Sequence, residues 1–172
     1  MNVELAVRRA TENDAERLAE IYNWYIEHTS ITFETEAVSV GELRQRIVKT
    51  LAGHDWLVGE FQKRIVGYAY FGPFRSRAAY IRTVESTVYV SQESKGKGFG
   101  KKLYSVLIDS ASERGFREVI GVIALPNPVS IAMHARLGFR EAGILRSVGY
   151  KFGAYHDVAL WQRSLPPTLS AP

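Results

Sequence analysis

The feature that most constrains this chain is an alternating segment followed at once by a glycine-rich basic turn. Residues 83–90 read TVESTVYV, which is rich in β-branched residues and typical of a strand. Residues 92–103 read QESKGKGFGKKL, in which glycines and lysines lead into a helical pattern. Such a turn aims backbone N–H groups at one point, at the positive end of a helix dipole. The sequence therefore predicts a phosphate-binding turn beside a strand that carries one carboxylate, Glu85.

The spacing of this turn excludes two common phosphate-binding motifs. A P-loop has four residues between its first glycine and a Gly-Lys pair, and Ser or Thr follows that pair. Here three residues separate Gly96 from Gly100, and Lys101 is followed by Lys102. A dinucleotide fingerprint requires G-x-G-x-x-G, whereas the position that needs the last glycine holds Lys101. From the turn alone, a solvated glycine-rich loop without a ligand stays open as an alternative.

The composition indicates one globular domain. The chain has 172 residues, of which 46% are hydrophobic, and this is enough for a sizeable core. We expect a single domain over residues 1–165 and a loose tail over 166–172. The net charge of +4 suits an anionic cofactor but is too small to indicate nucleic acid. No cysteine is present, which excludes disulfides and thiolate chemistry and fits the cytoplasm.

Other classes of partner have no sequence signal. The first ten residues, MNVELAVRRA, are too short and too soon charged for a signal peptide. No apolar run approaches the length of a membrane span, so we expect no membrane partner. His28, His54 and His156 show no ligand spacing with one another or with acidic clusters, so we expect no metal.

The order of expected elements is β-α-α-β-β-β-α-β-α-β-β, which is an α/β or α+β sheet domain with helices on its faces. Ser39-x-x-Glu42 is a capping box, and Asn127 followed by Pro128 is a strong helix start. A hairpin turn is expected at residues 62–63, and Gly72-Pro73 should end the strand that follows it. Strands are expected at 3–8, 55–61, 64–71, 79–90, 118–125, 141–150 and 155–165, and helices at about 15–26, 39–51, 98–114 and 128–137.

Two motifs together resemble the GNAT acetyltransferases. Residues 95–100, KGKGFG, resemble the Q/R-x-x-G-x-G/A loop that holds the pyrophosphate of acetyl-CoA in that family, with Lys95 in the Gln or Arg position. Residues 127–139, NPVSIAMHARLGF, resemble the family's N-x-x-(A/S)-x-x-(L/M)-(Y/H)-x-x-x-G-F helix. The resemblance implies the GNAT acyl-CoA N-acyltransferase fold, which has a mixed, mostly antiparallel sheet flanked by about four helices.

The resemblance is more specific along residues 75–100. RSRAAYIRTVESTVYVSQESKGKGFG is similar to the corresponding stretch of the phosphinothricin acetyltransferases and of the related enzymes that acetylate methionine sulfoximine and methionine sulfone. The segments at 21–23, 32–34, 67–69 and 149–153 also match that subfamily, so the resemblance covers nearly all of the chain to about Leu165. It implies acetyl-CoA as co-substrate, a homodimer, and a role in detoxification and in resistance to antibiotics or herbicides.

Catalysis is expected to depend on Glu85 and His134. An amine must lose a proton to attack a thioester, and a nearby carboxylate can take that proton directly or through water. The family assigns this role to the Glu of its TVE motif, which matches Glu85; a Glu that binds substrate or orients a neighbour is the alternative. His134 occupies the position where many members have a tyrosine that protonates the departing thiolate. A helix histidine that only binds or packs is equally consistent with the sequence.

The remaining site residues are assigned by the resemblance. Backbone groups of the strand are expected to bind the pantetheine arm where the strand splays from its neighbour, although ordinary ladder hydrogen bonds are the alternative. Which lysine meets the phosphates, Lys101 or Lys102, stays open. The expected cofactor-binding residues are Val88, Tyr89, Val90, Lys95, Gly96, Lys97, Gly98, Phe99, Gly100, Lys101, Asn127 and Ser130.

A basic loop is expected to hold the acceptor. Arg75 and Arg77 suit an amino-acid carboxylate or a phosphinate because guanidinium groups bind such anions in a bidentate manner; ordinary surface charge is the alternative. Phe33, Tyr80 and Tyr89 could wall the pocket or belong to the core. The expected substrate-binding residues are Phe33, Arg75, Ser76, Arg77, Tyr80, Glu85, Ser86 and Thr87.

The sequence therefore indicates a cytoplasmic N-acetyltransferase that moves acetyl from acetyl-CoA to the α-amine of phosphinothricin, methionine sulfoximine, methionine sulfone or a similar amino acid. Without a cysteine, direct transfer in a ternary complex is expected. Alternatives are acetylation of a protein N-terminus or a polyamine, an acyl-CoA-binding sensor without activity, and a nucleic-acid module. An acidic pocket would suit a polyamine, whereas this loop is basic.

Overall fold

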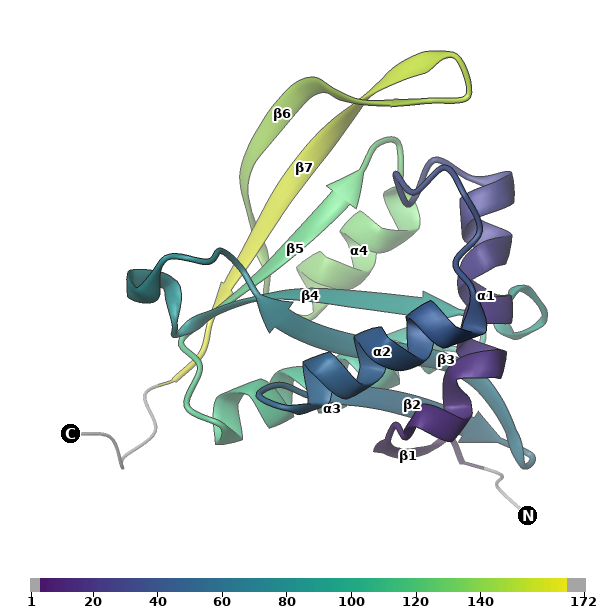
Figure 1. Ribbon diagram of the computed structural model, residues 1–172. Helices are drawn as coiled ribbons and strands as arrows, with labels where there is room; N and C mark the ends of the chain where they lie inside the picture. Colours follow the sequence, from purple (N-terminus) through teal and green to yellow (C-terminus); the bar gives the residue numbers. More distant parts are fainter. Residues whose placement is uncertain (1–3, 167–172) are drawn as a thin grey trace.

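A seven-stranded mixed sheet forms the body of the protein (Figure 1). The computed structural model describes residues 4–166. The strands lie in the order β1-β2-β3-β4-β5-β7-β6. Among the described strands only β4 and β5 pair in parallel, and the other pairs are antiparallel. The strands are β1 (Ala6–Arg9), β2 (Trp56–Phe61), β3 (Arg64–Pro73), β4 (Thr83–Val90), β5 (Glu118–Ala124), β6 (Arg140–Lys151) and β7 (Ala154–Ser164).

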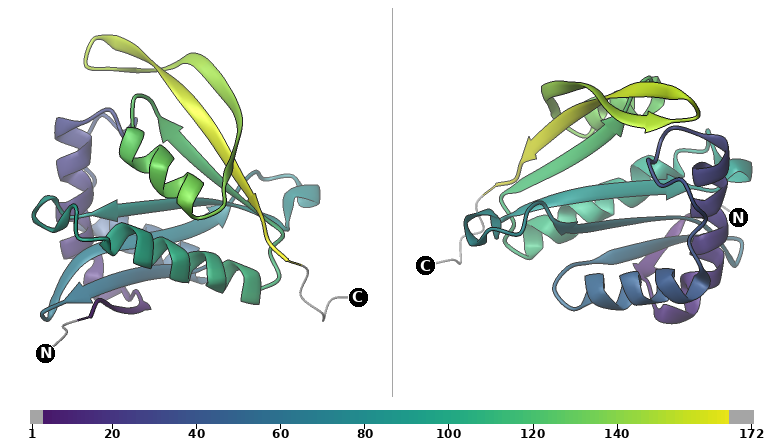
Figure 2. Two further views of the ribbon diagram at one scale, coloured as in Figure 1. Left: turned by 180° about the vertical axis from the view of Figure 1, so that it is seen from behind. Right: turned by 45° about the horizontal axis from the view of Figure 1, so that its top comes forward.

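Helices cover both faces of the sheet (Figures 1 and 2). The helices are α1 (Ala15–His28), α2 (Val40–Leu51), α3 (Phe99–Glu113) and α4 (Pro128–Arg136), with short 3₁₀ turns η1 (Glu12–Asp14), η2 (Ala78–Tyr80) and η3 (Gln92–Ser94). One apolar cluster joins α1 and α2 to Tyr68 and Tyr89 of the sheet. A second joins α3 to Val84 and Phe71 on the opposite face.

The two clusters fix the direction of every side chain on β4. Successive residues of a strand point to opposite faces. Val84 belongs to the cluster under α3, and Tyr89 belongs to the cluster under α1 and α2. Glu85 and Thr87 therefore lie on the α1–α2 face with Tyr89, while Ser86 and Val88 lie on the α3 face.

Local sequence signals set most element boundaries. The Ser39 Oγ accepts a hydrogen bond from the Glu42 N–H at 3.1 Å, and the Asn127 Oδ1 accepts one from the Ser130 N–H at 3.1 Å, so both expected caps are present. Gln62 and Lys63 both have positive φ, of 51° and 63°. This is the two-residue turn whose twist matches a hairpin.

The first strand was expected from residue 3 but begins at Ala6. Two further predicted strand boundaries, both beside Glu85, are also wrong. The strand that carries Glu85 was expected from residue 79, but it begins at Thr83 because residues 78–80 form the turn η2, with the Tyr80 N–H bonded to the Arg77 carbonyl. The preceding strand does not end at Gly72; it continues to Pro73, which pairs with Val84. A proline at the last position of a strand costs the ladder only one donor. Residues 167–172 of the expected tail lie outside the described residues.

The central opening of the sheet lies between β4 and β5. These strands pair only from Thr83 with Glu118 to Ser86 with Gly121. Beyond that point β5 continues alongside β7, to Ala124 opposite Val158, and β4 continues alongside β3, to Val90 opposite Gly67. Within the described residues, β4 therefore has no strand on its β5 side from Thr87 onward, as the resemblance implied.

Candidate active site

The glycine-rich turn joins the open end of β4 to the start of α3. Gly96 and Gly98 have φ of +76° and +80°, and a Cβ added to either would meet nothing within 4 Å. Residues 95–98 are exposed. The first N–H groups of a helix have no partner within the helix. The turn therefore presents an accessible helix N-terminus of the kind that binds phosphate groups.

The lysines of this turn differ in their surroundings. The Lys95 Nζ lies 5.1 Å from the ring centre of Trp24 and 5.0 Å from that of Tyr25, which fixes it against α1. Lys102 pairs with Glu4 at 3.6 Å. Lys97 and Lys101 have no ion pair among residues 4–166, so they are the cations of the turn that remain available to an anion.

The Glu85 carboxylate occupies a half-buried position with open space beside it. On β3 the residue paired with it is Gly72, where an added Cβ would meet nothing within 4 Å. Burial raises the pKa of Glu85, and the charge of Arg75 lowers it by a smaller amount. A carboxylate whose pKa is raised by burial takes a proton more readily than an exposed one.

The β3–β4 loop carries both expected arginines. Arg75 acts on the Glu85 carboxylate through its charge, and its guanidinium carbon lies 5.0 Å from the Phe74 ring centre. Phe74 in turn packs edge-to-face against Tyr80. Ser76 and Arg77 are exposed and have no recorded side-chain partner among the described residues.

His134 lies in the interior, on the α3 face of the sheet. Its side chain is 4% exposed. The Nδ1 atom lies 2.8 Å from the Ser130 carbonyl oxygen, so it carries the proton, and the Nε2 atom accepts from the Tyr104 hydroxyl at 3.0 Å. Burial lowers the pKa of His134 and keeps the ring neutral. Any side chain at Gly121 would overlap this ring.

Ser86 belongs to the same buried network rather than to the Glu85 side of the sheet. Because the Tyr104 proton goes to His134, the Ser86 hydroxyl donates to the Tyr104 oxygen at 2.7 Å, and it also lies 3.2 Å from the Ile120 carbonyl oxygen. Sequence reasoning missed Tyr104. Its signal is a tyrosine on the buried face of α3, because a buried hydroxyl requires a partner. The network ties together β4, β5, α3 and α4 where the two central strands separate.

The α1–α2 loop, which carries Phe33, meets the β6–β7 hairpin (Figure 2). Its ring packs on Gly149, and any side chain at that position would overlap it. Beside this contact, the buried Lys151 Nζ donates to the Thr32 carbonyl at 2.9 Å. We call Thr32, Phe33, Gly149 and Lys151 the clasp. Sequence reasoning matched its residues to a subfamily but did not foresee that they meet.

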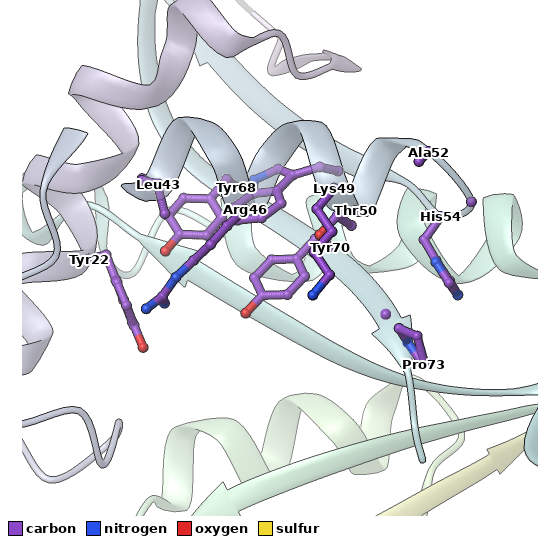
Figure 3. A pocket seen from close by; sticks show the side chains of 13 residues that line it. Tyr22, Leu43, Arg46, Lys49, Thr50, Ala52, His54, Tyr68, Tyr70 and Pro73 are labelled. Atoms are coloured by element: carbon purple, nitrogen blue, oxygen red, sulfur yellow. The ribbon is translucent and has the colours of Figure 1, made fainter. Parts of the chain in front are cut away.

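A hollow of about 580 Å³ lies beneath α2 on the same face as Glu85 (Figure 3). Figure 3 shows Arg46 reaching from α2 toward Tyr22 of α1, while Lys49 of the same helix extends beside Tyr70 of the sheet. The residues that line it are Tyr22, Leu43, Arg46, Lys49, Thr50, Ala52, Gly53, His54, Trp56, Tyr68, Tyr70, Gly72 and Pro73.

Residues 7–160 match the family model described as an acetyltransferase (GNAT) domain. The match covers most of the chain. This chain belongs to the GNAT acetyltransferase family.

Two further findings concern metal ions and membranes. Within residues 4–166 no cluster of His, Asp or Glu side chains is arranged to hold a metal ion, and no helix there is long and apolar enough to cross a membrane.

Curated relatives are similar along almost the whole chain. A phosphinothricin N-acetyltransferase from Streptomyces viridochromogenes is 41% identical over 157 residues, which cover 91% of this chain and 86% of the relative. An L-methionine sulfoximine/L-methionine sulfone acetyltransferase from Salmonella typhimurium is 35% identical, covering 94% of this chain and 95% of the relative.

Solved structures agree with the fold. A GNAT superfamily phosphinothricin acetyltransferase from Sinorhizobium meliloti, in complex with acetyl-CoA, superposes with a TM-score of 0.91 at 35% identity and covers 96% of this chain and 94% of its own. A ribosomal-protein-alanine N-acetyltransferase from Brucella melitensis superposes with a TM-score of 0.92 at 36% identity, covering 94% and 100%. The family's fold is therefore present in full.

Proposed function

We propose that this chain transfers the acetyl group of acetyl-CoA to the α-amine of a small amino acid such as phosphinothricin, methionine sulfoximine or methionine sulfone. The observation that carries the proposal is the position of Glu85 on β4, one residue before the strand parts from β5. The phosphinothricin and methionine sulfoximine acetyltransferases among its relatives support this choice of acceptor.

The cofactor is proposed to enter the opening between β4 and β5. The N-terminus of α3 and the turn at residues 95–98 would hold its pyrophosphate. N–H groups of β4 beyond Ser86 would bind the pantetheine arm, and one of them would stabilise the oxyanion that forms on the thioester carbonyl. Asn127 and Ser130 begin α4 beside this opening, which supports their assignment to the cofactor. Lys97 and Lys101 would supply positive charge to the phosphates of the cofactor.

Catalysis is proposed to proceed by direct attack. Glu85 takes a proton from the ammonium group, and the neutral amine forms the C–N bond. The tetrahedral intermediate then breaks its C–S bond, and the departing CoA thiolate takes up the second proton that the nitrogen loses, which gives the amide and free CoA thiol. The contacts of His134 support a positioning role, since its Nδ1 proton is held by the Ser130 carbonyl and its Nε2 accepts from Tyr104. His134 thereby holds the two central strands in register around the opening.

Arg75 is proposed to bind the acceptor's α-carboxylate, because its charge already reaches Glu85. Tyr80 supports the loop through Phe74, and Phe33 closes the site from the side of the clasp. The activity would act in the cytoplasm and inactivate toxic amino-acid analogues.

Release of free thiol from acetyl-CoA tests this function. The purified protein would be offered an amino-acid panel, a polyamine and a peptide with an N-terminal alanine. We expect release with phosphinothricin, methionine sulfoximine or methionine sulfone, and mass spectrometry of the product should show acetylation on nitrogen. Release with none of these amino acids would overturn the proposal.

A second candidate acceptor is a protein N-terminus. The similarity to a ribosomal-protein-alanine N-acetyltransferase supports it. The peptide in the panel distinguishes the two, because acetylation of the peptide in preference to every amino acid would establish this candidate instead.

A further inference from the structure

We propose that the hollow beneath α2 is a subsite for the acceptor's side chain, built to receive an anionic group through Lys49. This inference rests on the proposed function and deepens it, because it divides the two ends of the acceptor between two cationic elements. Arg75 of the β3–β4 loop would take the α-carboxylate, and Lys49 of α2 would take a carboxylate or phosphinate at the end of the side chain.

The hollow opens beside the proposed base. Gly72 lines it and pairs directly with Glu85 across the β3–β4 ladder. Paired residues of antiparallel strands lie about 5 Å apart at their Cα atoms. Tyr70 also lines it and pairs with Thr87, which shares the face of Glu85. An amine at Glu85 therefore has room to direct its side chain over Gly72 and Tyr70, under α2.

The floor of the hollow is aromatic. Trp56 stacks on Tyr70 with ring centres 4.1 Å apart and an interplanar angle of 17°. The Trp56 Nε1 is buried and has no hydrogen-bond partner among the described residues. Aromatic faces suit the methylene groups of a side chain, and a few polar atoms among them fix its orientation.

The charge of the hollow is cationic. Among the residues of the described range that line it, none is acidic, whereas Arg46 and Lys49 contribute guanidinium and ammonium groups. Arg46 is already held by Glu34 at 2.6 Å, and it also contacts Glu42. Lys49 has no recorded ion pair or hydrogen bond within residues 4–166, and Figure 3 shows its side chain directed toward Tyr70. Lys49 is therefore the cation that an acceptor's anion can meet.

This arrangement selects a class of acceptor. A side chain of a few methylene groups that ends in a carboxylate or phosphinate would satisfy both the aromatic floor and Lys49. A side chain that ends in a neutral sulfone would use the floor alone. The subsite should favour the anionic acceptor, because a charge-assisted hydrogen bond is about twice as strong as a neutral one.

The test compares one anionic and one neutral acceptor in the full chain. Lys49→Met should lower kcat/KM for phosphinothricin by about tenfold to a hundredfold, the value of one charge-assisted contact. It should change kcat/KM for methionine sulfone by less than about threefold and leave the KM for acetyl-CoA unchanged. Lys49→Arg should keep the preference. Lys63→Met, in the β2–β3 turn, is the matched control and should change neither acceptor.

Calorimetry separates this inference from the proposed function. Phosphinothricin would be titrated into protein saturated with CoA, and its affinity should fall about tenfold or more in Lys49→Met. If the wild type acetylates no amino acid but this loss of affinity is seen, the proposed function fails and the subsite stands. Equal effects of Lys49→Met on both acceptors, or no effect on either, would overturn the subsite whether or not the wild type is active.

Discussion

At the scale of single residues, the site depends on one charged group whose surroundings are set by its neighbours. Glu85 faces the same side as Thr87 and Tyr89, next to Gly72, where no side chain fills the space. The strand alternates so that residues on one side hold the core under α3 while those on the other line the site. This alternation predicted the strand correctly from sequence, but the open space at Gly72 depends on a register that the sequence does not reveal.

Replacing Glu85 by Gln removes the proposed base while keeping the shape of the side chain. Turnover should fall by about tenfold to ten-thousandfold, the usual range for general-base catalysis, whereas acetyl-CoA affinity should stay the same. Steady-state kinetics and calorimetry with acetyl-CoA measure the two effects. Glu36→Gln, at an exposed position of the α1–α2 loop, is the control. A Glu85→Gln enzyme with normal turnover at every pH would remove Glu85 from the mechanism.

The pKa of Glu85 predicts the pH dependence of the reaction. Burial raises this pKa, and only the ionised carboxylate can accept a proton. Turnover should therefore fall as the pH drops through the raised pKa. Arg75→Ala removes the charge that lowers the pKa, so the acidic limb of the profile should move to higher pH. Rate profiles of the wild type and the variant check the direction, and a shift to lower pH would contradict the assigned role of Arg75.

At the scale of elements, short-range signals predicted far more than long-range ones. The caps at Ser39 and Asn127 and the turn at residues 62–63 each act through neighbours in the sequence, and the structure contains all three. The clasp joins Thr32 to Lys151, which are 119 residues apart. The Tyr104–His134 contact likewise depends on how α3 and α4 pack. No local pattern encodes such meetings, which is why sequence reasoning named His134 without its partner.

The turn between η3 and α3 should fail if Gly98 acquires a branched side chain. Gly98→Val places a β-branched residue at a φ of +80°, which is strained, and its side chain would stand where the pyrophosphate approaches. We expect loss of acetyl-CoA binding by calorimetry, with the circular dichroism spectrum retained. Gly41→Ala, in the first turn of α2, is the control. Unchanged cofactor affinity in a folded Gly98→Val protein would mean that this turn does not hold the pyrophosphate.

The clasp should affect the acceptor and not the cofactor. In Gly149→Ala the new methyl group overlaps Phe33, so the ring must leave its present position. We expect a higher KM for the amino acid and an unchanged KM for acetyl-CoA, with a loss of stability of about 1–3 kcal/mol from overpacking. Glu141→Ala, at the other end of β6, is the control. Equal changes in both KM values would show that the clasp supports the whole fold rather than the acceptor side.

At the scale of the whole molecule, the β6–β7 hairpin extends beyond the rest of the sheet (Figure 1). Within the described residues, β6 is an edge strand with β7 as its neighbour. Several large apolar side chains of the hairpin are exposed, and the exposed fractions reach 71% at Tyr155. These residues are Leu145, Val148, Tyr150, Phe152 and Tyr155. Exposed apolar groups of this kind mark interaction surfaces.

We propose that a second copy of the chain covers this hairpin. Light scattering after size exclusion should give twice the mass of the 19.3 kDa chain. The double substitution of Tyr150 and Tyr155 by Glu should give the monomer mass, because charge at a buried interface is costly. A double substitution of Glu16 and Glu20 by Gln, on the surface of α1, serves as the control and should keep the dimer mass. A wild-type protein that is monomeric at micromolar concentration would contradict the proposal.

The position of β7 determines when during synthesis the enzyme can become active. Among residues 4–166 it is the last strand in the sequence, yet it lies between β5 and β6 in the sheet. A chain folds from its N-terminus as it leaves the ribosome. The edge of β5 and the whole of β6 therefore have no partner strand until β7 has been synthesised. Lys151, which completes the clasp with the early Thr32, reaches its place with the same hairpin. We therefore expect acetyltransferase activity only after β7 has been released, and a nascent chain that carries Glu85 and the glycine-rich turn but not β7 should be inactive.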